Sequence, residues 1–242
     1  MQKFNVMIKK HIPNAITCLN LLCGCVSILF TCYDHLLWAS AMVFVAAVFD
    51  FLDGFAARIL NAKSPIGAEL DSLSDVVSFG VAPSFILAWF FSKMGFGWWI
   101  YDVNVFPMLA FFIAMFGAIR LAKFNIDPRQ SESFIGLPIP AVGLFIASLS
   151  FLILKTRGDT LIFKIVMNPY FMLIMTAILC WLMVSEMPFF SFKFKTLRLD
   201  RDNILRYFVI IFAITALLLL KLVALPFIFL FYILLSLVSF RG

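Results

Sequence analysis

Long apolar runs recur along the whole chain, and they leave it few possible folds. They cover residues 13–32, 36–58, 69–92, 104–123, 138–155, 167–187, 205–222 and 224–241. Most are close to the ~20 residues that a helix needs to cross a membrane. The chain is 64% hydrophobic and only 13% charged, unlike a soluble domain. Because lipid offers no partner to backbone polar groups, runs of this length favour helices. The sequence predicts an all-α polytopic membrane protein, with residues 1–242 as a single membrane domain.

Basic residues are shared unevenly between the two ends of the predicted spans. With the N-terminus in the cytoplasm, fourteen of the 19 lysines and arginines fall on the cytoplasmic side, which fits the positive-inside bias. Such loops meet anionic lipid heads, so the net charge of +6 indicates membrane lipids, and not nucleic acid, as partners. The expected location is the inner membrane of a cell, crossed several times. The five cysteines lie in or beside apolar runs, as small buried residues do.

Four aspartates stand where such a chain least tolerates charge. Asp50 and Asp53 are three residues apart at the end of one run, and Asp71 and Asp75 are four apart at the start of the next. Both spacings put the pair on one face of a helix. A helix–turn–helix would bring the two pairs together, and four like charges need cations between them. The pattern predicts a cytoplasm-facing site for hard divalent cations held by oxygen.

The neighbours of the aspartates indicate what such a site would do. A pair of divalent cations can clamp the attacking and leaving oxygens of a phosphoryl transfer. Gly54 and Gly67 leave room for a ligand, and Arg58 can present a planar charge to phosphate. A membrane cation transporter is the alternative from another class, although transport sites tend to lie near the middle of the membrane.

The same residues resemble the signature of a known family. The pattern Asp-x-x-Asp-Gly-x-x-Ala-Arg-x8-Gly-x3-Asp-x3-Asp is that of the CDP-alcohol phosphatidyltransferases. All eight fixed positions match, namely Asp50, Asp53, Gly54, Ala57, Arg58, Gly67, Asp71 and Asp75. The resemblance implies a six-span core, here residues 13–193, followed by two additional C-terminal helices within 205–241. It also implies a homodimer.

Further segments resemble the branch of that family that makes phosphatidylserine. They are Ser78 to Pro83, Arg120 to Asn125, Phe134 to Ala141, Leu182 to Ser185 and Ser191 to Lys193. The segment from Pro13-Asn14 through Thr17 and Asn20 to Gly24 resembles members of the family that handle CDP-diacylglycerol. Lys123 stands where that branch has arginine. The resemblance implies transfer of a phosphatidyl group from CDP-diacylglycerol to L-serine, with release of CMP. Glycerol 3-phosphate or an inositol phosphate as acceptor is the alternative within the family.

The resemblance also assigns roles to residues. Asp50, Asp53 and Asp71 would be the principal ligands of two divalent ions, Mg²⁺ or Mn²⁺. Asp75 would be the general base and would also contact the second ion. The CDP moiety would be bound by Asn14, Thr17, Asp50, Asp53, Gly54, Ala57, Arg58 and Gly67.

The acceptor pocket is assigned from the remaining motifs. Arg120 and Lys123 lie near the cytoplasmic end of the fourth run and can hold a carboxylate; a role in topology alone is the alternative. Asn125, Gly136 and Pro138 are expected to shape the acceptor pocket. They equally fit a structural loop followed by a helix start.

Overall fold

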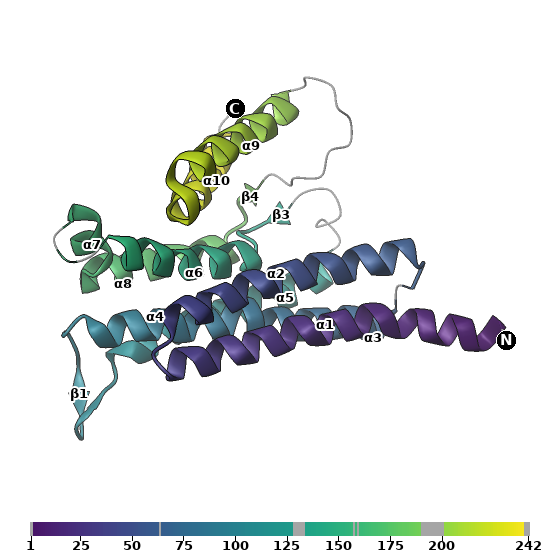
Figure 1. The fold of residues 1–242 in the computed structure, drawn as a ribbon, viewed down its shortest axis with the longest axis horizontal. Coiled ribbons are helices and arrows are strands. Elements are labelled where there is room, and N and C mark those ends of the chain that lie inside the picture. Colours follow the sequence, from purple (N-terminus) through teal and green to yellow (C-terminus); the bar gives the residue numbers. More distant parts are fainter. Residues whose placement is uncertain are drawn as a thin grey trace.

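The first half of the chain forms a bundle of long helices. A computed structural model describes residues 2–62, 64–127, 134–156, 158, 160–189 and 201–239. Helix α1 (Gln2–Cys32) turns at Tyr33–His35 into α2 (Leu36–Ile59) and packs along it. A third long helix follows from Pro65 to Lys93, and α5 (Phe112–Ile126) comes after a 3-10 turn at Phe106–Phe111, η2. In Figure 1 these helices lie along one common direction.

The third long helix changes its winding immediately after Asp75. It consists of α3 (Pro65–Asp75), the π-helical segment η1 (Val76–Val81) and α4 (Ala82–Lys93). Pro83 has no N–H to donate to the carbonyl of Phe79, four residues before it, so the regular α-helical ladder is interrupted there. Gly143 lies against that carbonyl: a Cβ built on it would stand 2.8 Å from the Phe79 oxygen. Single π-turns in α-helices are frequent at functional sites.

The second half of the chain covers one side of this bundle. It contains α6 (Ile139–Lys155), the short α7 (Leu161–Val166) and α8 (Pro169–Val184). Two-residue strands β3 (Phe134–Ile135) and β4 (Pro188–Phe189) pair antiparallel, with Phe134 opposite Phe189. Strands β1 (Trp99–Ile100) and β2 (Val103–Asn104) form a hairpin at the far end of the bundle (Figure 1).

The last two helices form an antiparallel hairpin that crosses the bundle obliquely (Figure 1). Helix α9 (Arg201–Leu220) passes through the 3-10 turn η4 (Lys221–Ala224) into α10 (Leu225–Ser239). Lys221 has a φ of +54°, which makes the bend. The ring of Phe231 on α10 lies 4.2 Å from that of Phe212 on α9. Helix α10 also packs on α6 and on β4.

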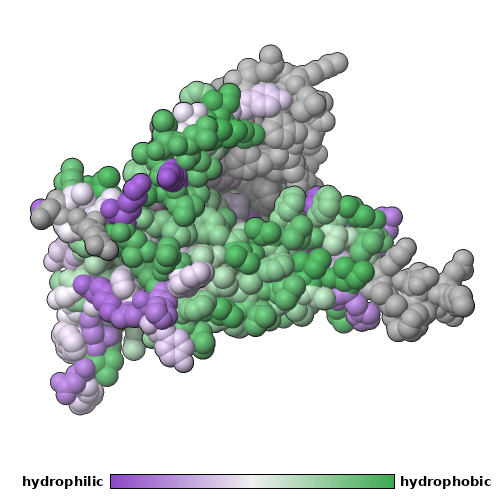
Figure 2. All heavy atoms as spheres, viewed as in Figure 1, coloured by the Kyte–Doolittle hydropathy of each residue, from purple (hydrophilic) through white to green (hydrophobic). Residues whose placement is uncertain are grey.

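The surface has the hydropathy of a membrane protein. Five apolar helical segments in the described part are long enough to cross a membrane: His11–Cys32, Leu36–Ile59, Pro65–Lys93, Phe106–Ile126 and Tyr207–Ser236. The face drawn in Figure 2 carries a broad apolar band, with polar side chains gathered toward the two ends of the bundle. The predicted all-α polytopic membrane fold is therefore confirmed.

The ends of several predicted runs differ from the helices. The run at 69–92 starts earlier, at Pro65, because Ser64 caps the helix and accepts a hydrogen bond from the Gly67 N–H. The run at 167–187 ends at Val184, because the chain then extends into β4. Helices α6 and α8 have only 17 and 16 residues, fewer than the ~20 expected of a span.

Buried hydroxyl groups help hold the helices together. The Ser40 hydroxyl of α2 donates a 2.7 Å hydrogen bond to that of Ser150 on α6, and the Ser27 hydroxyl of α1 donates to the Ala39 carbonyl at 2.8 Å. Small polar residues of this kind are typical where membrane helices meet, since lipid provides no hydrophobic drive for their association.

Candidate active site

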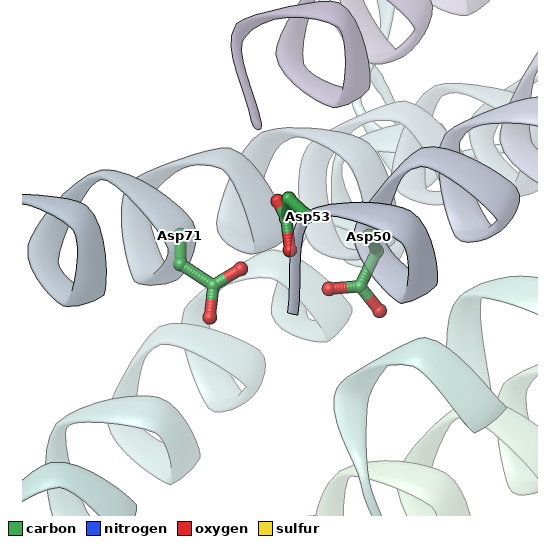
Figure 3. A group of neighbouring side chains, drawn as sticks. All are labelled: Asp50, Asp53 and Asp71. Carbon is green, nitrogen blue, oxygen red and sulfur yellow. The ribbon is translucent and has the colours of Figure 1, made fainter. Parts of the chain in front are cut away.

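Three of the four aspartates meet where α2 ends and α3 begins. Asp50, Asp53 and Asp71 each offer a carboxylate oxygen, and these oxygens lie within 4.8 Å of one another. Figure 3 shows Asp50 and Asp53 on one helix and Asp71 on another, with the three carboxyl groups converging on the same space. The helix–turn–helix expected from the spacing has therefore formed.

The turn between the two helices is built by local signals. Asn61 takes a positive φ of +47°, a backbone conformation that asparagine tolerates better than most residues. Pro65 stands in the first turn of α3, where a missing N–H costs nothing. Gly67 lies close to α1 as well: a Cβ on it would stand 3.0 Å from Asn14 Oδ1. The glycine thus lets the start of α3 approach the first helix.

The donor set of the cluster fits a divalent cation. Asp53 Oδ2 and Asp71 Oδ1 are buried, and neither accepts a hydrogen bond from the described residues. A buried carboxylate oxygen left in this way is costly unless a cation or a donor satisfies it. Three carboxylates at this spacing match the oxygen ligands that Mg²⁺ and Mn²⁺ prefer.

Asp75 stands apart from the cluster of three. It is buried, and its Oδ1 accepts a hydrogen bond from Asn20 Nδ2 of α1 at 3.4 Å. Its carboxyl interacts electrostatically with those of Asp50 and Asp71. Asp75 therefore lies near the other aspartates with its own hydrogen-bond partner, which suits a group that handles a proton.

A cavity of about 190 Å³ opens beside Asp53 and Asp71. Of the residues predicted to bind CDP, six line it: Asn14, Thr17, Asp53, Gly54, Ala57 and Gly67. Asp50 belongs to the aspartate cluster, and the exposed Arg58 donates from its Nε to the Gly54 carbonyl at 2.9 Å. Arg58 is thus fixed at the edge of the site by its own helix.

The residues predicted for the acceptor pocket separate into two groups. Arg120 of α5 is buried and interacts electrostatically with Asp75. Lys123 is exposed, and Asn125 Nδ2 donates to the Ser72 hydroxyl of α3 at 3.0 Å. Gly136 has a φ of +76°, and a Cβ there would meet the Met183 carbonyl oxygen at 2.4 Å. Pro138 occupies the N-cap position of α6. Gly136 thus lies in a turn against the end of α8, and Pro138 lies at the start of α6.

The sequence analysis gave no role in the site to two residues that belong to it. Asn20 is fully buried on α1 and bonds Asp75, while Ser64 both caps α3 and lines the cavity. Asn20 carried a usable signal, because an amide in the middle of an apolar span needs a partner. Ser64 did too, since a serine directly before proline at a helix start is a typical N-cap.

Comparison with known proteins agrees with this geometry. Residues 10–187 match the family model of CDP-alcohol phosphatidyltransferase. The chain is 38% identical over 184 residues to the CDP-diacylglycerol–serine O-phosphatidyltransferase of Bacillus subtilis, covering 76% of this chain and 92% of that protein. It is 38% identical to the enzyme of that name from Helicobacter pylori, over 55% of this chain and 54% of that protein. It is 37% identical to the enzyme of that name from Methanocaldococcus jannaschii, over 56% of this chain and 58% of that protein. The chain belongs to the CDP-alcohol phosphatidyltransferase family.

Proposed function

We propose that this protein transfers the phosphatidyl group of CDP-diacylglycerol to L-serine and releases CMP. The observation that carries the proposal is the position of Asp75, a buried carboxyl that interacts both with the aspartate cluster and with the buried Arg120. A base therefore lies near groups suited to a pyrophosphate and a group suited to a carboxylate. Family membership and the names of the relatives support the same reaction.

Asp50, Asp53 and Asp71 would hold two divalent ions, Mg²⁺ or Mn²⁺. Asp75 would be a further ligand of the second ion. When bound, such ions supply positive charge that neutralises the pyrophosphate and the departing CMP. The unsatisfied oxygens of Asp53 and Asp71 support this assignment.

The CDP moiety would occupy the cavity beside Asp53. Gly54, Ala57 and Gly67 offer it a wall of small side chains, and Asn14 and Thr17 of α1 offer polar groups. Arg58 at the edge would face the phosphates. The two acyl chains would stay in the lipid, so that only the head group leaves the bilayer.

Asp75 would act as the base in a direct displacement. The serine hydroxyl oxygen bonds to the phosphorus that carries the diacylglycerol, and the bond from that phosphorus to the CMP oxygen breaks. Asp75 takes the hydroxyl proton, and CMP leaves with the electron pair of the broken bond. A serine hydroxyl is a poor nucleophile without a positioned base.

Arg120 would bind the carboxylate of the acceptor serine through its planar fork. Lys123 and Asn125 would lie at the mouth of this pocket, with Gly136 and Pro138 shaping the loop beside it. We assign the site to the cytoplasmic face of the inner membrane from the distribution of lysine and arginine. The division into a core at 13–193 and two C-terminal helices, and the homodimer, likewise remain proposals from the resemblance.

The direct test is CMP release by purified protein supplied with CDP-diacylglycerol and Mg²⁺ or Mn²⁺. L-serine, glycerol 3-phosphate and inositol phosphate are compared as acceptors. We expect release with serine alone. Release with a phosphorylated alcohol alone would overturn the acceptor and keep the family chemistry, whereas ion flux through the protein in vesicles without any CMP release would favour a transporter.

A further inference from the structure

The hairpin of β1 and β2 carries exposed aromatic side chains at the end of the bundle away from the aspartate cluster. It joins the third long helix, which ends at Lys93, to η2, which begins at Phe106. Trp99 is 69% exposed and Tyr101 is 98% exposed. Exposed as well are Trp98, Ile100 and Val103. Large apolar side chains gathered in one exposed place mark an interaction surface, and the proposed reaction gives this one no role.

Hydrogen bonds give the hairpin a fixed shape. Its two-residue turn, Tyr101-Asp102, has φ values of +46° and +63°, both positive as a type I′ turn requires. At the base, Asn104 Oδ1 accepts from the Phe106 N–H at 3.1 Å, and Asn104 Nδ2 donates to the Phe96 carbonyl at 3.3 Å. Glycine, asparagine and aspartate suit such a turn best, so turn chemistry does not account for a tyrosine at its tip.

A cluster of rings fixes the hairpin to the helices. The ring of Phe106, which is buried, lies 5.8 Å from that of Trp98 and 4.8 Å from that of Phe91 on α4. The ring of Phe96 lies 5.0 Å from Phe106 and 5.7 Å from Tyr170 on α8. Three helical segments, α4, η2 and α8, therefore contribute to the base of the hairpin. Its position relative to the bundle is set by packing.

The hairpin stands at the level where the membrane-crossing helices end. The apolar segment Pro65–Lys93 ends shortly before it, and Phe106–Ile126 begins shortly after it. Lys93 and Asp34 form an exposed ion pair of 3.0 Å at the same end, so charged side chains resume there. In Figure 1 the hairpin projects across the common direction of the helices, to one side of the bundle. It therefore extends along the membrane surface.

The exposed side chains fit the boundary between lipid tails and head groups. Tryptophan and tyrosine bury an apolar ring at this boundary while the N–H or O–H stays hydrated. Residues 94–105 contain no lysine or arginine, and Asp102 is their one acidic residue. Recognition of anionic lipid needs basic side chains, so the hairpin suits a boundary of any lipid charge.

The size of the surface favours lipid over a second copy of the chain. The hairpin offers five exposed apolar residues, Trp98 to Tyr101 and Val103. Each side of a stable protein interface contributes about 20–30 residues. A lipid boundary sets no such minimum, because each ring partitions into it independently.

We propose that the β1–β2 hairpin anchors the protein in the interfacial zone of the leaflet opposite the aspartate cluster, with Trp99 and Tyr101 at the level of the lipid head groups. Because the hairpin is fixed to the end of α4, the anchor sets the depth of the third long helix in the membrane. The other end of that helix carries Asp71 and Asp75, so the anchor also holds these carboxyl groups at a constant depth. The inference does not depend on the proposed reaction.

Depth-dependent quenching of tryptophan fluorescence tests the anchor in nanodiscs of phosphatidylcholine. The emission of the wild type minus that of Trp99→Phe isolates the contribution of Trp99, whose exposure lets it be replaced without leaving a cavity. We expect bromine near the top of the acyl chains to remove more of this contribution than bromine near their ends. Iodide in the water should remove little of it.

A second probe reports on the tip itself. Tyr101→Trp in the Trp99→Phe background moves the reporter to the turn, and its emission should show the same order of quenching. Both measurements are repeated with phosphatidylglycerol added and at high salt. The order should not change, because residues 94–105 carry no basic side chain. An order of quenching that appears only with the anionic lipid would overturn the inference.

Other results would overturn it as well. Strong quenching by iodide with little quenching by brominated lipid would place the hairpin in water. Stronger quenching by bromine near the ends of the acyl chains would place it in the hydrocarbon. Protection from both quenchers would mean that another copy of the chain covers the hairpin.

Discussion

Asn20 on the first helix donates a hydrogen bond from its Nδ2 to Oδ1 of Asp75 on the third, across 3.4 Å and 55 positions of sequence. Both residues are buried. The bond ties the candidate base to a helix that carries none of the other aspartates. The orientation of Asp75 is therefore set separately from that of the cluster.

Asp75→Asn should abolish turnover while CDP-diacylglycerol still binds. The amide keeps the size of the side chain but cannot take the serine proton, and a positioned base contributes about 10²–10⁴-fold to a rate. CMP release and binding of the lipid substrate are measured side by side. Glu69→Gln, an exposed change on the same helix, is the control. Turnover within tenfold of the wild type would remove Asp75 as the base.

Asn20→Ala should lower kcat about tenfold, the usual scale for losing a hydrogen bond to a charged group. Binding of Mn²⁺ should change little, because the hydrogen bond that Asn20 donates goes to Asp75 and to none of the three clustered carboxylates. Thr31→Ala is the control, since among the described residues that hydroxyl bonds the Ser27 carbonyl of its own helix alone. Equal losses of kcat in Asn20→Ala and Thr31→Ala would mean that the loss comes from altered helix packing.

Asp71→Asn should weaken Mn²⁺ binding at least about tenfold, as expected when one ligand of an oxygen site is removed. Mn²⁺ titration by electron paramagnetic resonance measures this without turnover. Chelation should stop CMP release in the wild type, and added Mg²⁺ or Mn²⁺ should restore it. Asp75→Asn in the same titration separates the roles: retained affinity would leave Asp75 as base alone, and lost affinity would make it a ligand too.

Gly24→Ala should destabilise the protein by about 1–3 kcal/mol, the usual cost of overpacking. The added Cβ would stand 2.6 Å from Ser78 Oγ and 2.8 Å from Ser78 Cα, and the backbone of η1 cannot move aside cheaply. Gly80→Ala is the graded control, because its Cβ would meet Ala114 Cα at 3.4 Å. Equal losses of Tm would show that the contact with Ser78 does not limit packing.

Asp34→Asn should lower the Tm at neutral pH, and the difference should fade as the pH falls below about 4. The Trp89 indole N–H and the Lys93 ammonium, 3.0 Å away, hold the pKa of Asp34 below its ordinary value. A lowered pKa stabilises the fold above the pKa of the unfolded chain and stops doing so once the folded group is protonated. Asp102→Asn is the matched control, since both aspartates are exposed and have a positive φ. A difference that is constant with pH would contradict the prediction.

The features of the structure that the sequence predicted well are local ones. Spacings of three and four residues place each pair of aspartates, Asp50 with Asp53 and Asp71 with Asp75, on one face of a helix. The short turn between the two helices could also be predicted from the sequence. The apolar runs likewise predicted the helices, because each run must satisfy its backbone within itself. These features depend on residues a few positions apart.

What the sequence did not predict depends on how distant segments pack. The partnership of Asn20 with Asp75, and of β3 with β4 across more than 50 residues, follows from the arrangement of the helices and leaves no periodic trace. Helix α3 starts earlier than predicted because Ser64 caps it, and α8 ends earlier than predicted because the chain extends into β4.

The π-helical segment after Asp75 has a consequence for the phase of the third helix. A wider turn uses about one more residue than an α-turn, so it rotates everything beyond it relative to what precedes it. The aspartates of α3 can therefore face the site while the side chains of α4 face their own neighbours, although both belong to one continuous rod. The π-helical segment thus sets the rotation between the face of α3 that carries the aspartates and the face of α4 that packs on its neighbours. Removal of a single residue from this segment would rotate one of these faces away from its position.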